Sequence, residues 1–305
     1  MNVERGPVTP QSTGGPGITR FATRGEHRLS YESSGVRDAI PVLALHDLLA
    51  DRGQLRPLAE PPHDALFRLT LPDARGHGAS PMLSGRAYPP SELAADALAV
   101  LDAEGLPSAH LVAIGWAAAT ALFLAASAPP RVASLVLAAP YLPVLAAQDS
   151  DAVARQTGAA HLEMMQEAAD LAAKGQMDRA LDVFLGARMG TDWRDRFSKP
   201  RLGAIRRSAG NLAPLLAGSI GASIDADALK RLDMPVVLLV KEDAEVLERV
   251  TVETLASLVP RARITIVPQQ STERLASGSE WTEAIAEALG SAPPPIPARM
   301  PSPNT

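Results

Sequence analysis

Strand-like and helix-like segments alternate along most of this chain, and the alternation limits the folds that it can adopt. Buried strands are predicted where short apolar runs end at turn residues, at 40–46, 65–73, 109–115, 132–140, 234–240 and 262–268. Helical spacing lies between them, as at 91–105. This order favours a mainly parallel sheet with helices on both faces. With 305 residues, 46% of them hydrophobic, the chain can bury such a core.

One long segment, 141–230, breaks the alternation because it contains several predicted helices in a row. We expect it to form an all-helical lid over the carboxyl edge of the sheet, where ligands of open α/β sheets bind. The core is then 18–140 together with 231–290. The tails at 1–17 and 291–305 are rich in Pro, Gly and Ser, and we expect them to be disordered.

Composition excludes several classes of site. The chain has no cysteine, which rules out disulfides and thiolate metal ligands, and its net charge of -5 argues against nucleic acid as a partner. No apolar run is long enough for a membrane span, and the N-terminus has no apolar signal region. We expect a cytoplasmic protein without metal or cofactor, since no helix carries paired histidines and no glycine-rich phosphate loop follows a strand.

The stretch "VAIGWAAATAL" (112–122) has the pattern of a strand that turns sharply into a helix. Small residues flank the turn on both sides, as a tight elbow requires. The stretch nevertheless contains no serine, cysteine or aspartate, so a seat for a nucleophile is present without a nucleophile.

Several segments together resemble the α/β-hydrolase fold over about residues 25–290. "LALHD" (43–47) resembles the strand that supplies part of the oxyanion hole, and "LPDARGHGAS" (71–80) resembles the family's Asp-x-Arg-Gly-His-Gly-x-Ser loop. The resemblance implies a mainly parallel eight-stranded sheet flanked by helices, with the helical lid as an insertion. It also implies a nucleophile on the elbow, a histidine base and an orienting acid.

Overlaid on that pattern, the three triad positions carry no triad residue. The nucleophile position is Gly115, the acid position is Ala244 (or Asp243 after a shift of one), and the histidine position is Thr272. None of the six histidines lies beyond His161, although the family's catalytic histidine follows the last strand. The resemblance therefore predicts a degenerate triad and no covalent acyl-enzyme.

An oxyanion hole can persist, because backbone amides build it. By resemblance its donors are the N–H groups of Leu48 and Trp116, and a ligand would contact these two residues together with Gly115 and Thr272. Asp47 stands where the family usually has glycine. His46 and Asp47 are the candidate acid/base groups, although His46 can equally pack beneath the loop and Asp47 can be solvated or cap a helix.

Two features of the lid leave its ligand open. Its large apolar residues can line a cavity or pack the lid helices together: Met164, Met165, Phe184, Met189, Trp193 and Phe197. Its basic run can be a solvated face or can attract an anionic ligand: Arg188, Arg194, Arg196, Lys199, Arg201, Arg206 and Arg207.

Three functions remain as alternatives. The first is binding of a small, largely apolar carbonyl-type ligand between core and lid, with cofactor-free lyase, isomerase or cyclase chemistry. The second is a non-catalytic pseudoenzyme that binds a ligand or pairs with itself or with an α/β-hydrolase relative as a homo- or hetero-dimer. The third is a hydrolase whose catalytic groups are relocated, for example with a water held by His46 and Asp47.

Overall fold

The predicted strands form one sheet in the computed structural model, which describes residues 17–82, 86–268 and 279–292. The eight strands are β1 (Ile18–Arg24), β2 (His27–Ser34), β3 (Ile40–Leu45), β4 (Phe67–Pro72), β5 (Ala109–Ile114), β6 (Val132–Ala138), β7 (Val236–Lys241) and β8 (Ala262–Val267). Their order across the sheet is β1-β2-β4-β3-β5-β6-β7-β8. The strands β1 and β2 pair antiparallel, as do β2 and β4, and all pairs from β4 to β8 are parallel.

Alternate side chains of the central strands enter two separate cores. On one face Leu43 and Leu111 pack with helices α1 (Pro90–Ala103), α2 (Ala117–Ser127) and α10 (Val246–Leu258). On the other face Val42 and Val112 pack with the 3-10 helix η1 (Arg52–Ala59) and helix α11 (Glu280–Gly290). Burial on both faces explains why these strands are nearly continuous apolar runs. The predicted fold class, a mainly parallel eight-stranded sheet flanked by helices, is confirmed.

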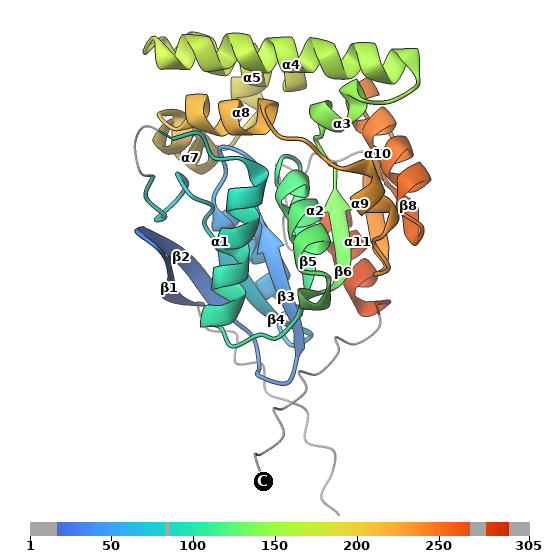
Figure 1. The fold of residues 1–305 in the computed structure, drawn as a ribbon. Helices are drawn as coiled ribbons and strands as arrows, with labels where there is room; N and C mark the ends of the chain where they lie inside the picture. Colours follow the sequence, from blue (N-terminus) through green and yellow to red (C-terminus); the bar gives the residue numbers. More distant parts are fainter. Residues whose placement is uncertain (1–16, 83–85, 269–278, 293–305) are drawn as a thin grey trace, which may run out of the picture.

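Between β6 and β7 the chain forms a helical insertion, which crosses one end of the molecule (top of Figure 1). The helices there are α3 (Pro143–Ala147), α4 (Ala152–Ala173), α5 (Met177–Met189), α6 (Trp193–Arg196), α7 (Lys199–Ala209) and α8 (Leu212–Ile220). The last helix before β7, α9 (Ala226–Lys230), lies lower and packs against α2 and α10 of the core. The short 3-10 helix η2 (Pro129–Arg131) precedes β6. In the part of the chain that the structure describes, no helix is long and apolar enough to span a membrane.

A third apolar cluster joins this insertion to the loops at the end of the sheet. Most of the large apolar residues that we named in the insertion pack inside it, including Met165, Phe184, Trp193 and Phe197. Leu48 and Trp116 enter the same cluster from the core. Packing of the insertion onto the core is thus the main role of these side chains. The two predicted disordered tails lie outside the described residues, apart from Gly17, Ser291 and Ala292.

Candidate functional site

The turn between β5 and α2 is the elbow that the sequence predicts, and it requires glycine at its tip. Gly115 has φ +55°, in the left-handed region that other residues enter only with strain. Its N–H donates to the carbonyl of Ala138 at 2.9 Å, and its own carbonyl accepts from the N–H of Tyr141 at 3.0 Å. A Cβ placed on Gly115 would lie 2.5 Å from Cγ of Asp47. No side chain fits at the tip unless Asp47 moves.

Asp47 fills the space above the elbow. Its side-chain Oδ1 accepts hydrogen bonds from the N–H groups of Leu48 and Trp116, each at 2.8 Å. These are the two amides that the family resemblance names as oxyanion donors, and here they converge on a carboxylate of the chain itself. Trp116 directly precedes helix α2, so the carboxylate also lies at the positive end of the helix dipole. Asp47 is only 2% exposed, and it is neither solvated nor open to bulk water.

His46 holds the Asp47 loop from below. Its Nε2 accepts the N–H of Ala74 at 2.9 Å, and its Nδ1 donates to the carbonyl of Asp47 at 2.8 Å. Burial lowers the pKa of His46, although the nearby carboxylate of Asp73 acts to raise it. Both ring nitrogens serve the backbone, as expected for a histidine that packs beneath the loop. Neither nitrogen is left free for acid/base chemistry.

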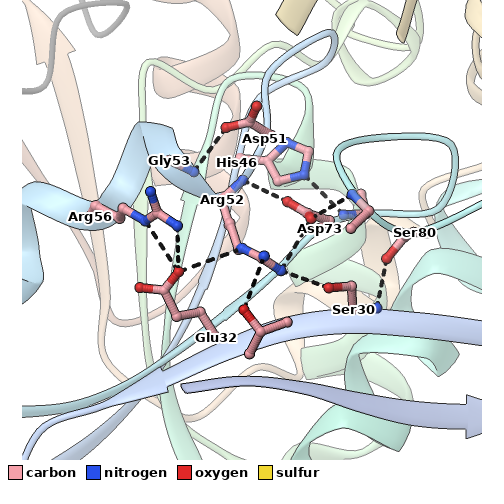
Figure 2. A network of polar contacts seen from close by, with 12 residues as sticks. Ser30, Glu32, His46, Asp51, Arg52, Gly53, Arg56, Asp73 and Ser80 are labelled. Carbon is pink, nitrogen blue, oxygen red and sulfur yellow. Dashed lines mark hydrogen bonds and ion pairs between the residues drawn. The ribbon is translucent and has the colours of Figure 1, made fainter. Parts of the chain in front are cut away.

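Asp73, in the Asp-x-Arg-Gly-His-Gly loop, fixes the same region through a buried polar network (Figure 2). One oxygen of Asp73 accepts the N–H of Arg52 at 2.9 Å, and the other accepts the N–H of Ala79 at 2.8 Å. The Arg52 guanidinium lies 3.3 Å from Asp73 and donates to the hydroxyl of Ser30 at 2.7 Å. The network ties η1, β2 and the loop after β4 together, and its role is structural.

Replacing Asp73 by alanine should therefore lower stability without touching the elbow directly. Two backbone N–H groups and Arg52 would lose a buried acceptor, and we expect a loss of about 2 kcal/mol in the free energy of unfolding. Urea denaturation of Asp73→Ala measures it, with the exposed Asp233→Ala as the matched control. Equal stability of the two variants would contradict the structural role.

His77 supports the other side of the Asp47 loop. Its Nε2 accepts the N–H of Leu49 at 3.0 Å, and its Nδ1 donates to the carbonyl of Arg75 at 3.1 Å. Leu49 itself has φ +61°, a strained conformation for a residue other than glycine. Burial lowers the pKa of His77 to about 3, with a smaller contribution from His46. The imidazole is thus neutral, and its two hydrogen bonds hold the backbone at Leu49 and Arg75 in place.

A cavity of about 320 Å³ lies between the elbow and the helical insertion. Its floor is Asp47, Gly115 and the segment after β6, its roof is formed by α4 and α5, and one wall is the β7–α10 turn. The ionisable side chains in its lining are Asp47, Tyr141, His161, Arg188, Lys241, Glu245 and Glu248. We expected a site for a largely apolar ligand. The lining is instead mixed, because the insertion and the β7–α10 turn contribute charged residues.

Arg188, near the end of α5, contacts the Asp47 carboxylate above the elbow. Its guanidinium lies 3.3 Å from Oδ2 of Asp47, and its Cζ lies 4.3 Å and 5.2 Å from the ring centres of Tyr141 and Phe184. The contact joins the insertion to the Asp47 loop. Two aromatic faces and one carboxylate together stabilise the positive charge in a position that is 16% exposed.

Beside Arg188, a tyrosine and a histidine face each other in the cavity. The hydroxyl of Tyr141 lies 3.2 Å from Nδ1 of His161, within hydrogen-bond distance. Burial raises the pKa of Tyr141 above its ordinary value, against the effect of Arg188, so the phenol stays protonated. Burial lowers the pKa of His161, Arg188 lowers it further, and Glu245 opposes both. Near neutral pH the pair is therefore a phenol and a neutral imidazole.

A second ion pair lies on the β7–α10 wall. The ammonium group of Lys241 lies 3.4 Å from the carboxylate of Glu248, which also accepts the N–H of Lys241 at 3.1 Å. Burial raises the pKa of Glu248, while its pairing with Lys241 acts in the opposite direction. The two charges offset each other, which leaves Arg188 and Glu245 as the cation and anion that act on His161 in opposite directions.

The remaining predicted site residues have varied positions. Leu48 and Trp116 are buried and contribute their amides, but neither lines the cavity, and the indole N–H of Trp116 donates to the hydroxyl of Ser219 at 2.6 Å. Ala244 is buried in the turn after β7, and Asp243 is exposed there. Thr272 lies outside the described residues. Within the described ranges, no cluster of three or more histidine, aspartate or glutamate side chains could hold a metal ion.

Sequence reasoning did not assign Tyr141 or His161 a role, and it placed Arg188 only in a basic run. A weak signal was available for two of them. Tyr141 lies shortly after a buried strand, and His161 is the one histidine of six within 141–230. Their proximity could not be deduced, because they come from a loop and from α4.

Comparisons with known proteins agree with the fold described above. A family model described as "alpha/beta hydrolase fold" matches residues 40–221. A curated relative, the putative carbamate hydrolase RutD of Variovorax paradoxus, is 35% identical over 109 residues, which are 36% of this chain and 41% of the relative. The match thus spans less than half the length of that relative.

Solved structures of low sequence identity have the same fold. An alpha/beta hydrolase from Sphaerobacter thermophilus superposes with a TM-score of 0.70 at 20% identity, covering 89% of this chain and 99% of that one. The enol-lactonase from Burkholderia xenovorans gives a TM-score of 0.70 at 18% identity, covering 89% and 100%. At these identities the likeness shows the fold alone.

Proposed function

We propose, from the premise that this chain belongs to the α/β-hydrolase fold family, that it binds a small carbonyl compound between core and insertion without covalent hydrolysis. The insertion acts as the lid of that site. In the first form of this proposal the protein catalyses a cofactor-free, non-hydrolytic reaction of that compound. In the second form it binds the compound without catalysing a reaction.

The carrying observation is the position of the Asp47 carboxylate. It occupies the point on which the amides of Leu48 and Trp116 converge, and it fills the volume that a side chain at residue 115 would need. A nucleophile needs that volume, and a tetrahedral intermediate needs those two amides. The Asp47 side chain occupies that volume and accepts hydrogen bonds from both amides.

The cavity supports the binding part of the proposal. Its volume is within the range of small-molecule sites, and its polar groups come from separate elements that converge on one space. Strained backbone occurs in its lining at Ala139, with φ +45°, and two residues after Asp47 at Leu49, with φ +61°. These are the non-glycine residues with positive φ in the described ranges. Strain of this kind is concentrated at functional sites.

Hydrolysis of p-nitrophenyl acetate tests the non-hydrolytic part. We expect the wild type and Gly115→Ser to release p-nitrophenol no faster than buffer. The wild type has no nucleophile at residue 115, and in both proteins the Asp47 carboxylate occupies the two amides that would bind the oxyanion. Wild-type turnover that disappears in Asp47→Asn would overturn the proposal and favour a hydrolase with relocated groups. The exposed Asp233→Asn is the control for the substitution itself.

Ligand-observed NMR tests the binding part. The probes are acetophenone, a neutral carbonyl compound, and phenylpyruvate, which carries a carbonyl and a carboxylate. We expect saturation transfer to at least one of them. The transfer should weaken in Ala187→Trp, because Ala187 lines the cavity and the larger side chain would reduce its volume. Absence of transfer to both probes contradicts a carbonyl-binding role.

A further inference from the structure

We propose that Tyr141 and His161 form a proton-transfer pair for an enolisable 2-oxo acid, whose carboxylate is bound by Arg188. This inference rests on the proposed function and gives it a substrate class and a reaction, the interconversion of keto and enol forms. The observation that carries it is the meeting of a phenol, an imidazole and a guanidinium in one cavity.

The three groups come from three elements that the fold brings together. Tyr141 follows β6 and is positioned by the hydrogen bond from its N–H to the carbonyl of Gly115 at 3.0 Å. His161 projects from α4 and Arg188 from α5, so the insertion supplies two of the three. Tyr141 touches both partners, at 3.2 Å from its hydroxyl to Nδ1 of His161 and 4.3 Å from its ring centre to the guanidinium.

The guanidinium determines the substrate class. Arginine binds carboxylates through paired N–H donors, which match the two oxygens of a carboxylate in geometry as well as in charge. Asp47 lies 3.3 Å from Arg188 and is the carboxylate that a ligand would join or replace. Lys241 is paired with Glu248 and Arg188 with Asp47, so a ligand carboxylate at Arg188 would share or displace the Asp47 contact.

The reaction needs no co-reactant. The imidazole Nε2 takes a proton from the carbon next to the substrate carbonyl, and the electrons of that C–H bond form the C=C bond. The carbonyl π electrons move to oxygen, which takes the proton of the Tyr141 hydroxyl. Nδ1 of His161, which carries the ring proton at the start and donates it in the hydrogen bond to the Tyr141 oxygen, then transfers that proton to the Tyr141 oxygen. One C–H bond is broken and one substrate O–H bond is formed, and the ring proton has moved from Nδ1 to Nε2. Exchange of the ring proton with solvent restores the starting tautomer.

The protonation states fit these roles. Burial raises the pKa of Tyr141 and lowers that of His161, so the phenol keeps a proton to donate and the imidazole is free to accept one. The charges that face the pair are Arg188 from α5, Glu245 from the β7–α10 turn and Asp47 from the elbow side. Lys241 and Glu248 line the same cavity as an ion pair.

Phenylpyruvate is the test substrate, because its enol absorbs in the ultraviolet and its C3 protons exchange visibly in D2O by NMR. We expect the wild type to accelerate both tautomerisation and C3 exchange. Tyr141→Phe and His161→Gln should each lower kcat about 100-fold with KM changed less than about threefold, as for a lost acid or base. Arg188→Gln should instead raise KM by about tenfold, as for a lost charge-assisted contact, and the exposed Arg206→Gln in the same insertion should change neither.

The outcomes separate this inference from the proposed function. Binding of phenylpyruvate without accelerated exchange overturns the proton-transfer pair and leaves the binding role intact. Binding of acetophenone but not phenylpyruvate overturns the 2-oxo acid class alone. Exchange that persists in both Tyr141→Phe and His161→Gln also overturns the assignment. Ester hydrolysis by the wild type would overturn the proposed function itself.

Discussion

Gly115→Ser lowers the free energy of unfolding by about 4 kcal/mol, even though serine is the residue that this fold commonly seats there. Two costs add. A side chain at φ +55° is strained by about 1–3 kcal/mol, and overpacking against a buried group costs about 1–3 kcal/mol more. The second cost arises from Asp47, whose Cγ would lie 2.5 Å from the new Cβ. Urea denaturation at pH 7 measures the sum.

A double-mutant cycle isolates the clash with Asp47. Asp47→Gly alone should destabilise, since Arg188 loses its carboxylate and two amides lose their acceptor. In the background of Gly115→Ser it should cost less by about 1–3 kcal/mol, because the clash is removed with it. Gly186→Ser is the matched control, since Gly186 lies in α5 with open space around it. Additive effects at 47 and 115 would mean that the two side chains do not compete for one volume.

Stability should fall steeply between pH 7 and pH 5, which is the second large effect that we expect. The pKa of His77 is about 3 in the folded state against 6.5 for the free side chain, because burial disfavours its charged form. Between these values the unfolded chain binds a proton that the folded protein does not, so stability decreases as the pH falls. His77 alone should contribute a loss of about 2 kcal/mol from pH 7 to pH 5.

Other groups modify this dependence in known directions. Burial lowers the pKa of His46 as well, which adds to the loss, whereas the raised pKa of Glu248 acts against it. Urea denaturation at half-unit pH steps gives the slope, and His77→Asn should reduce proton uptake on unfolding by about one near pH 5.5. If that variant does not fold, the imidazole signals of wild-type His77 provide the check. A ring that titrates near its ordinary pKa in the folded protein contradicts the prediction.

The fold could be predicted because its signals are local. Apolar runs such as 109–115 and 132–140 mark strands buried on both faces, and the small residues of 112–122 mark the elbow. The loop at 71–80 was interpretable from its resemblance to the family's loop, although Asp73 accepts the N–H of Arg52, 21 residues away, as well as that of Ala79. The strands and the elbow depend on residues close in sequence, where periodicity and turn chemistry determine the conformation.

The contents of the site could not be predicted to the same depth, because they depend on contacts between distant segments. Asp47 was noted as an unusual residue beside the seat, but its hydrogen bond with Trp116 joins positions 69 residues apart. Arg188 reaches Asp47 from 141 residues away, which no local pattern in the basic run could indicate. A sequence pattern gives the type of residue available, whereas only the packing of α4 and α5 determines which of them meet.

The shared volume of Asp47 and Gly115 also limits which substitutions this chain can accept. A serine cannot be introduced by Gly115→Ser alone without the loss of stability predicted above, whatever activity the new side chain brings. Loss of the carboxylate first would leave Arg188 without its ion-pair partner. Whichever of the two positions changes first, the single variant is less stable than the present protein. Glycine at 115 and an acidic residue at 47 should therefore be retained together. Homologues should therefore carry an acidic residue at 47 together with glycine at 115, or neither of them.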